Sequence, residues 1–171
     1  MGNGARKLCL LSVLLFCCLA VSESMVSVVL AGEGTFTGIW VANGSKEVLT
    51  LGGERETALF KLSGDVKLTS KIGQASNYWS ECFGLADSET GSDLRCVWRS
   101  LDGNEIYLAL KGTRMEKGSS ISGSIIGGTG PAKGITGSLR FTWSMMSFKQ
   151  VNKEMGIGGF SKDLSGTYKL P

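Results

Sequence analysis

Glu81 is the ionisable side chain of this sequence that is best placed for chemistry. It shares one face of a predicted strand with three large apolar residues, Trp79, Phe83 and Leu85. If that face lined an apolar interior, the buried carboxyl would be a candidate acid–base or ligand-binding group. The alternate face of the same strand carries Tyr78, Ser80, Cys82 and Gly84. If the alternate face is the inner one, Glu81 is simply solvated. We favour this second arrangement and keep both open.

Cys82 and Cys96 are the other pair with reactive side chains. The remaining three of the five cysteines lie within the first 18 residues, in a segment that we expect to be removed. A lone cysteine pair in an oxidising compartment is most simply a disulfide, here closing a short loop. The alternative is two buried free thiols.

Several classes of chemistry are excluded by what the sequence lacks. Histidine is absent, which removes Ser-His-Asp and Cys-His nucleophile systems and the commonest zinc ligand. Asp87, Glu89 and Asp93 are close in sequence but lack the terminal glutamate of a calcium loop. The basic residues are scattered rather than clustered, so no nucleic-acid surface is indicated. We therefore predict no catalytic residue, no metal and no cofactor.

The segments that carry these side chains are predicted to be strands, because hydrophobic residues alternate with polar ones along them. Successive strand side chains point to opposite faces, so each such run has one dry face. The three clearest runs span residues 58–68, 105–111 and 135–143, and further strands are expected at 35–42, 46–51, 75–85, 95–100, 119–126 and 164–170. No segment shows a convincing helical period. Residues 145–160 are the least regular and are expected to form a loop.

Glycine-containing pairs separate these runs and favour tight turns. They are Asn43-Gly44, Gly52-Gly53, Asp102-Gly103 and Gly127-Gly128. Such pairs supply the positive φ that short hairpin turns need. Eight or nine short strands with one-sided alternation predict an all-β fold, a single antiparallel barrel of the calycin or allene oxide cyclase-like kind, with a sandwich as the alternative.

The glycine-rich segment IGGTGPAKGITG at residues 126–137 resembles the hairpin of the allene oxide cyclase-like barrel families, which are related to plant dirigent proteins. The segments RCVWRSLDGN at 95–104 and LSGTYKLP at 164–171 resemble uncharacterised bacterial members of these families. The resemblance implies an eight-stranded barrel with an apolar interior, often a homo-trimer. It carries over no cyclase site, because no catalytic residue matches one for one.

The start of the sequence has the layout of an export signal. Arg6 and Lys7 precede an uncharged apolar run over residues 8–21, and small residues follow. This layout predicts a signal peptide at 1–22, with an alternative end at 31, and a barrel domain at 32–171. We expect the protein to be periplasmic or secreted, with no membrane span in the mature chain; a lipid anchor is the minority alternative. Without Arg6 and Lys7, 16 basic and 15 acidic residues remain, a net charge of +1.

The function predicted from these features is a non-catalytic binding module for an apolar small molecule. The expected ligand-binding residues are Trp79, Glu81, Phe83, Leu108, Phe141 and Trp143. The alternative use of the four tryptophans is to fill the core. Two other functions stay open: a cyclase or isomerase that uses an apolar cavity, and a structural or assembly subunit of an envelope complex. The question that matters most is whether the barrel is hollow or filled with side chains.

Overall fold

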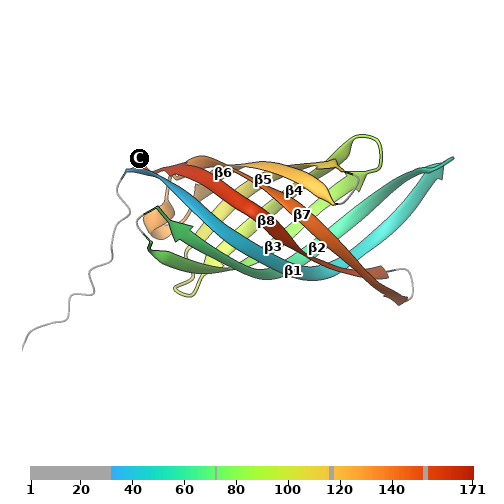
Figure 1. Ribbon diagram of the computed structural model, residues 1–171, viewed down its shortest axis with the longest axis horizontal. Coiled ribbons are helices and arrows are strands. Elements are labelled where there is room, and N and C mark those ends of the chain that lie inside the picture. The colour runs from blue at the N-terminus through green and yellow to red at the C-terminus, as the bar shows by residue number, and fades with distance from the viewer. Residues whose placement is uncertain (1–31, 72, 116–117, 152–153) are drawn as a thin grey trace, which may run out of the picture.

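The protein is a closed barrel of eight antiparallel strands (Figure 1). The computed structural model describes residues 32–71, 73–115, 118–151 and 154–171. The strands are β1 (Glu33–Gly52), β2 (Arg55–Ser70), β3 (Ala75–Asp87), β4 (Gly91–Ser100), β5 (Glu105–Arg114), β6 (Ser119–Gly128), β7 (Thr136–Val151) and β8 (Glu154–Lys169), with a 3₁₀ turn η1 (Gly130–Ala132) between β6 and β7. The all-β barrel prediction is confirmed, with eight strands. The predicted signal segment lies outside the described residues.

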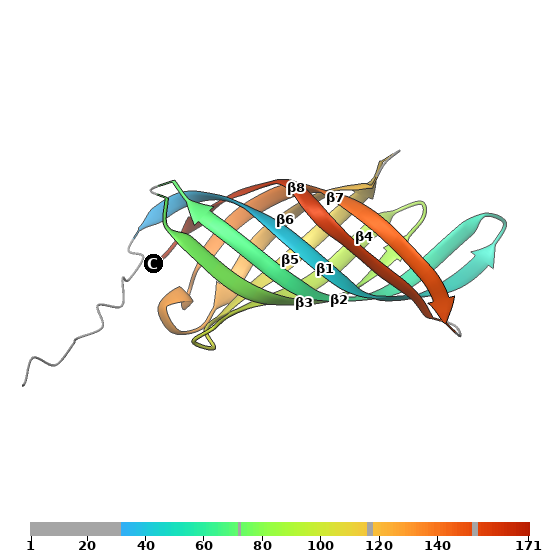
Figure 2. The same cartoon turned by 60° about the horizontal axis from the view of Figure 1, so that its bottom comes forward.

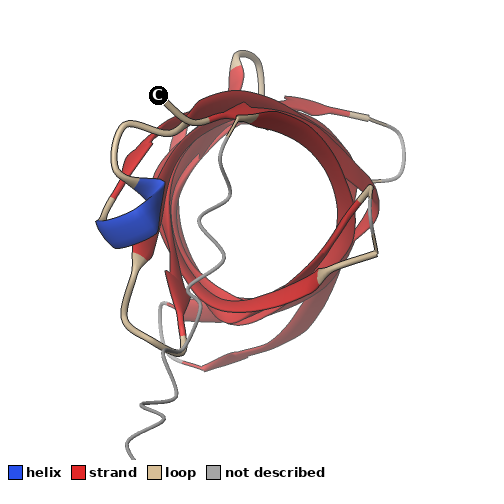
Figure 3. Ribbon diagram, turned by 90° about the vertical axis from the view of Figure 1, so that its left-hand side faces the viewer, coloured by secondary structure: helices blue, strands red, loops and turns tan. Residues whose placement is uncertain are grey.

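Each strand pairs with its neighbours in sequence, and β1 pairs with β8 to close the sheet (Figure 3). This up-and-down order gives the barrel two distinct ends. At the terminus end lie the start of β1, the end of β8 and η1; at the hairpin end lie the β1–β2, β3–β4 and β5–β6 turns (Figures 1 and 2). No helix among the described residues is both long and apolar enough to cross a bilayer.

The predicted alternation accounts for the core. In the three clearest runs, the apolar positions at 58–68, 106–110 and 135–143 point into the barrel, and the positions between them point outward. Closure of the eight strands into a barrel buries this inner face. Over most of its height the sheet has no free edge, so it offers no unpaired strand to which another chain could add. The barrel is therefore built on the period of two that the sequence shows.

Two predictions about local structure are wrong. Asn43 and Gly44 do not form a turn but lie within the continuous strand β1, opposite Ser63 and Leu62 of β2. A side chain at Gly44 would collide with the backbone carbonyl of Lys61, so glycine is needed there for close strand approach rather than for reversal. Residues 145–151 and 154–160 are not a loop: they belong to the long strands β7 and β8.

Candidate functional site

The barrel is filled at mid-height and hollow at both ends. Two cavities, of about 370 Å³ and 400 Å³, open at the terminus end and the hairpin end, and they share no lining residue. Between them lies a layer of buried, inward-facing side chains that line neither cavity, which we call the septum. The septum consists of Ala42, Val66, Ser80, Cys82, Cys96, Leu108, Leu139, Ser161 and Leu164. The interior of the barrel therefore contains two separate cavities.

Trp40 is fixed against the septum by two buried hydrogen bonds. Its ring Nε1–H donates to Ser80 Oγ at 2.7 Å, and its backbone N–H donates to Ser161 Oγ at 2.8 Å. The second bond sits where the pairing of β1 with β8 shifts register, so the hydroxyl replaces a lost ladder bond. Ser80 and Ser161 are the buried polar side chains among the described residues, and the hydroxyl oxygen of each accepts a hydrogen bond from Trp40.

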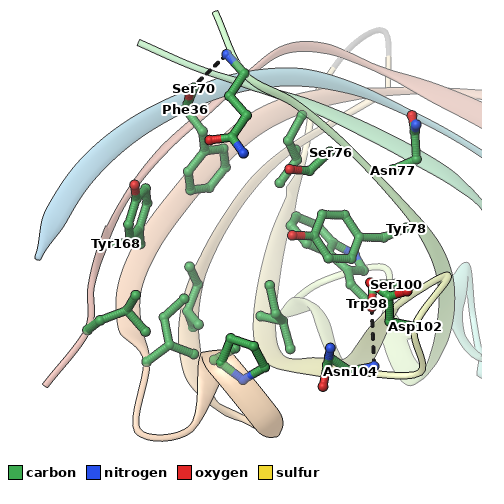
Figure 4. A pocket seen from close by; sticks show the side chains of 18 of the residues that line it. Phe36, Ser70, Ser76, Asn77, Tyr78, Trp98, Ser100, Asp102, Asn104 and Tyr168 are labelled. Carbon is green, nitrogen blue, oxygen red and sulfur yellow. Dashed lines mark hydrogen bonds between the residues drawn. The ribbon is translucent and has the colours of Figure 1, made fainter. Parts of the chain in front are cut away.

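The terminus-end cavity has apolar walls and a polar rim whose groups are mostly uncharged (Figure 4). The buried walls come from Phe36, Leu68, Trp98, Ile106, Ile125, Ile135 and Leu170, with Tyr78 and Tyr168 half-buried beside them. The polar lining comes from Ser70, Gln74, Ser76, Asn77, Ser100, Asp102 and Asn104. These side chains come from strands and turns that surround the opening, so they face a ligand from several directions. Asp102, in the β4–β5 turn, is the charged member of the lining.

Two rim turns are held by hydrogen bonds to serine hydroxyls (Figure 4). The backbone N–H of Gln74 donates to Ser70 Oγ at 3.1 Å, and that of Asn104 donates to Ser100 Oγ at 3.2 Å. Both hydroxyls lie at ends of strands that also line the cavity. The mouth is therefore shaped by the fold itself before any ligand arrives.

Tyr78 and Trp98, which both line this cavity, differ in the hydrogen bonding of their polar atoms. Burial raises the pKa of Tyr78, partly offset by its hydrogen bond with Ser76, so its phenol stays neutral at physiological pH. Trp98 packs beside Tyr78 with ring centroids 6.3 Å apart. Trp98 Nε1 is buried and has no hydrogen-bond partner among the described residues. Protein atoms cover Nε1, so a molecule in the cavity does not reach it, and the unpaired N–H costs free energy in this arrangement.

The structure places three of the predicted ligand-binding residues on the outside of the barrel. Trp79 and Phe83 are 47% and 55% exposed, and Glu81 forms an ion pair with Arg99 at 3.2 Å on the outer face. Placing the Trp79, Glu81 and Phe83 face inside is therefore wrong, and the alternate arrangement, with Ser80 and its neighbours inward, is the one observed. The physical reason is space: the septum has room for small side chains on β3, not for aromatic ones.

The other three predicted residues point inward but do not meet in one site. Phe141 and Trp143 line the hairpin-end cavity, whereas Leu108 is part of the septum. The aromatic residues of the terminus-end cavity are missing from the prediction; they are Phe36, Tyr78, Trp98 and Tyr168. The parity of β3 could have found Tyr78, because it shares its face with Cys82.

The predicted disulfide between Cys82 and Cys96 is confirmed. The two residues lie directly opposite each other on β3 and β4, with Cα atoms 4.1 Å apart, and both are buried. The bridge crosses the septum on its β3–β4 side. It therefore ties together two strands that each supply walls to both cavities.

Comparison with known proteins identifies no family for this chain. No family model matches the chain, and no curated protein matches it. Among solved structures, the pterocarpan synthase dirigent protein GePTS1 is similar over 81% of this chain and 86% of its own, with a TM-score of 0.42 and 11% sequence identity. The resemblance to the allene oxide cyclase-like families remains a prediction from sequence.

Proposed function

We propose that the protein is a binding module that holds a small, planar, uncharged molecule in the terminus-end cavity. One observation supports this above the others: a cavity of about 370 Å³ opens at the terminus end, with buried apolar walls and a rim made mostly of hydroxyl and amide groups. Small-molecule sites typically have a volume of roughly 300 to 1,000 Å³, apolar walls and a few polar groups. The cavity has each of these properties.

The chemistry of the lining selects against a charged ligand. Most of its polar groups are hydroxyls and amides, and the phenol of Tyr78 is kept neutral because burial raises its pKa. A charged group would lose its hydration without gaining a partner of opposite sign, except near Asp102. A planar molecule fits better, because aromatic rings stack offset or edge-on against side chains such as Phe36 and Trp98. The polar groups of that molecule would pair with hydroxyl and amide groups of the rim, such as those of Ser76 and Asn104.

Prodan, a neutral planar naphthalene with one carbonyl acceptor, is a suitable fluorescent probe. We expect the protein to bind it with a blue-shifted emission, as an apolar cavity requires. Ser76→Phe fills the terminus-end cavity from an inward-facing position and should weaken binding by more than about tenfold. Ala58→Phe makes the same kind of change in the hairpin-end cavity and should leave prodan affinity within about twofold.

A second variant tests the role of the indole donor. Trp98→Phe keeps an aromatic wall and removes the N–H; because protein atoms cover Nε1, prodan affinity should stay within about threefold. Binding that is insensitive to Ser76→Phe, or equally sensitive to Ala58→Phe, would show that the terminus-end cavity is not the site. The cyclase or isomerase alternative predicts conversion of the natural ligand. Recovery of an unchanged molecule from protein purified from its own source would support a binder.

A further inference from the structure

The hairpin-end cavity has an apolar floor like that of the first cavity. Its volume is about 400 Å³, and the septum separates it from the terminus end. The floor is formed by Trp40, Leu62, Leu110, Ile121, Phe141, Trp143 and Ile157. Two of its rings, those of Trp40 and Trp143, lie with centroids 5.0 Å apart. The floor is well packed, so the hollow above it is not a packing defect of the core.

The mouth of this cavity differs from the first in charge. Among the strand positions whose side chains the structure describes, the inward-facing charged residues are Lys46 on β1, Glu56 on β2 and Arg114 on β5. All three line the hairpin-end cavity. Asp87 also lines it, but its carboxylate is held by Arg55 at 2.9 Å. Two cations and one acid therefore surround an apolar hollow.

The apolar lining continues outward beyond the barrel wall. Pairing of β1 with β8 ends at Glu47, and pairing of β2 with β3 ends at Thr57, so the tip of the β1–β2 hairpin projects past the other turns (Figure 2). Val48 on this tip lines the cavity, as do Met115 and Met145 on other strands and turns. An apolar path thus leads from the floor to the mouth, which suits an elongated ligand better than a compact one.

We propose that the hairpin-end cavity is a second ligand site, for an amphiphile with a hydrocarbon chain and a zwitterionic head group. The chain lies on the aromatic floor near Trp143. The negative group of the head pairs with Lys46 and Arg114, and its positive group pairs with Glu56. A head of single sign leaves one of these partners facing a like charge, which is unfavourable. This site is independent of the first, because the septum separates them and the lining chemistry differs.

The four tryptophans allow the two sites to be told apart in one experiment. In protein labelled with 5-fluorotryptophan, Trp98 reports on the terminus-end cavity, Trp40 and Trp143 on the hairpin-end cavity, and Trp79 on the outer surface. Dodecylphosphocholine, added below its micelle-forming concentration, should shift the fluorine resonances of Trp40 and Trp143 and leave the other two in place. Ala58→Phe should abolish these shifts, and Ser76→Phe should preserve them.

The head-group assignment is tested with the same chain on different heads. Dodecylphosphocholine should bind more tightly than dodecanoate or dodecyltrimethylammonium, and Lys46→Gln or Glu56→Gln should each weaken it by about three- to fivefold, as for partly exposed ion pairs. Tighter binding of either single-sign amphiphile would overturn the zwitterionic assignment. Absence of shifts at Trp143, or a shift at Trp79 that follows the same titration curve, would overturn the site. Neither outcome depends on whether prodan binds at the other end.

Discussion

Removal of the Ser80 hydroxyl should destabilise the barrel because it leaves a buried indole N–H without an acceptor. The hydrogen bond from Trp40 Nε1 is 2.7 Å long, and Ser80 is fully buried while Trp40 is 2% exposed. Solvent therefore cannot replace the lost acceptor. An orphaned buried donor costs about 1–3 kcal/mol, and the complete burial here places Ser80→Ala near ~2 kcal/mol. For a domain of this size, that corresponds to a melting temperature lower by roughly 6 °C.

A double-mutant cycle isolates this hydrogen bond from any loss of packing. In a Trp40→Phe background the ring has no N–H to orphan, so Ser80→Ala should cost less than about 0.5 kcal/mol. Ser161→Ala is the matched control, because Ser161 accepts from the backbone N–H of Trp40, which a phenylalanine at this position retains. Its cost should be the same in both backgrounds.

The assay is urea unfolding followed by far-ultraviolet circular dichroism, with the disulfide intact in all variants. Stability should be taken from midpoints at a shared slope, since a changed slope would signal a change in the unfolded ensemble. If Ser80→Ala costs equally in the wild-type and Trp40→Phe backgrounds, the hydrogen bond is not what Ser80 contributes. The septum would then owe its rigidity to packing alone.

Three further outcomes follow from the geometry. Replacing Cys82 and Cys96 together with alanine should lower the free energy of unfolding by about 3 kcal/mol in the chain-entropy account of a short loop, measured by urea unfolding; no change would mean that the bridge is redundant with the strand pairing. The Arg55 guanidinium, with help from backbone N–H groups, lowers the pKa of the Asp87 carboxyl. The contribution of this ion pair to folding stability is therefore complete above the unfolded pKa near 3.8 and is lost as pH falls through the folded pKa. A carbon-13 titration should show the pKa of Asp87 rising in Arg55→Gln. Gly44→Ala should cost about 1–3 kcal/mol or more, because its methyl group meets the backbone of β2, and an unchanged melting temperature would contradict the close strand approach.

The fold could be predicted from sequence because the alternation of apolar and polar residues is strong where it matters. Every second residue along 62–68 is buried, and so are Ile135, Leu139, Phe141 and Trp143, as the pattern predicts. The turn predicted at Asn43-Gly44 is absent because glycine has two uses in a barrel that look the same in sequence. It can take a positive φ in a turn, or it can admit a neighbouring backbone within a strand. Only the paired strand, which sequence does not show, distinguishes them.

The site was harder to predict because hydropathy alone selects the wrong face of β3 as the inner one. The outer face of β3 carries Trp79 and Phe83, and its inner face carries Ser80 and Gly84. By hydropathy the first face belongs inside. The interior is narrow at that height, however, and is already filled by large side chains from other strands, such as Trp40. Side-chain volume across the barrel, rather than polarity along one strand, determines the orientation.

The tryptophans illustrate why core filling and ligand binding need not be alternatives. Trp40 and Trp98 are both buried, and each lines one of the two cavities. The N–H of Trp40 is paired with Ser80 of the septum, so it is not available to a ligand, whereas the N–H of Trp98 has no partner in the described chain. Neither N–H is open to a ligand, because protein atoms also cover Trp98 Nε1. Each indole therefore fills the core and closes the inner end of one cavity, and the polar groups of a ligand pair with the residues of the mouth instead.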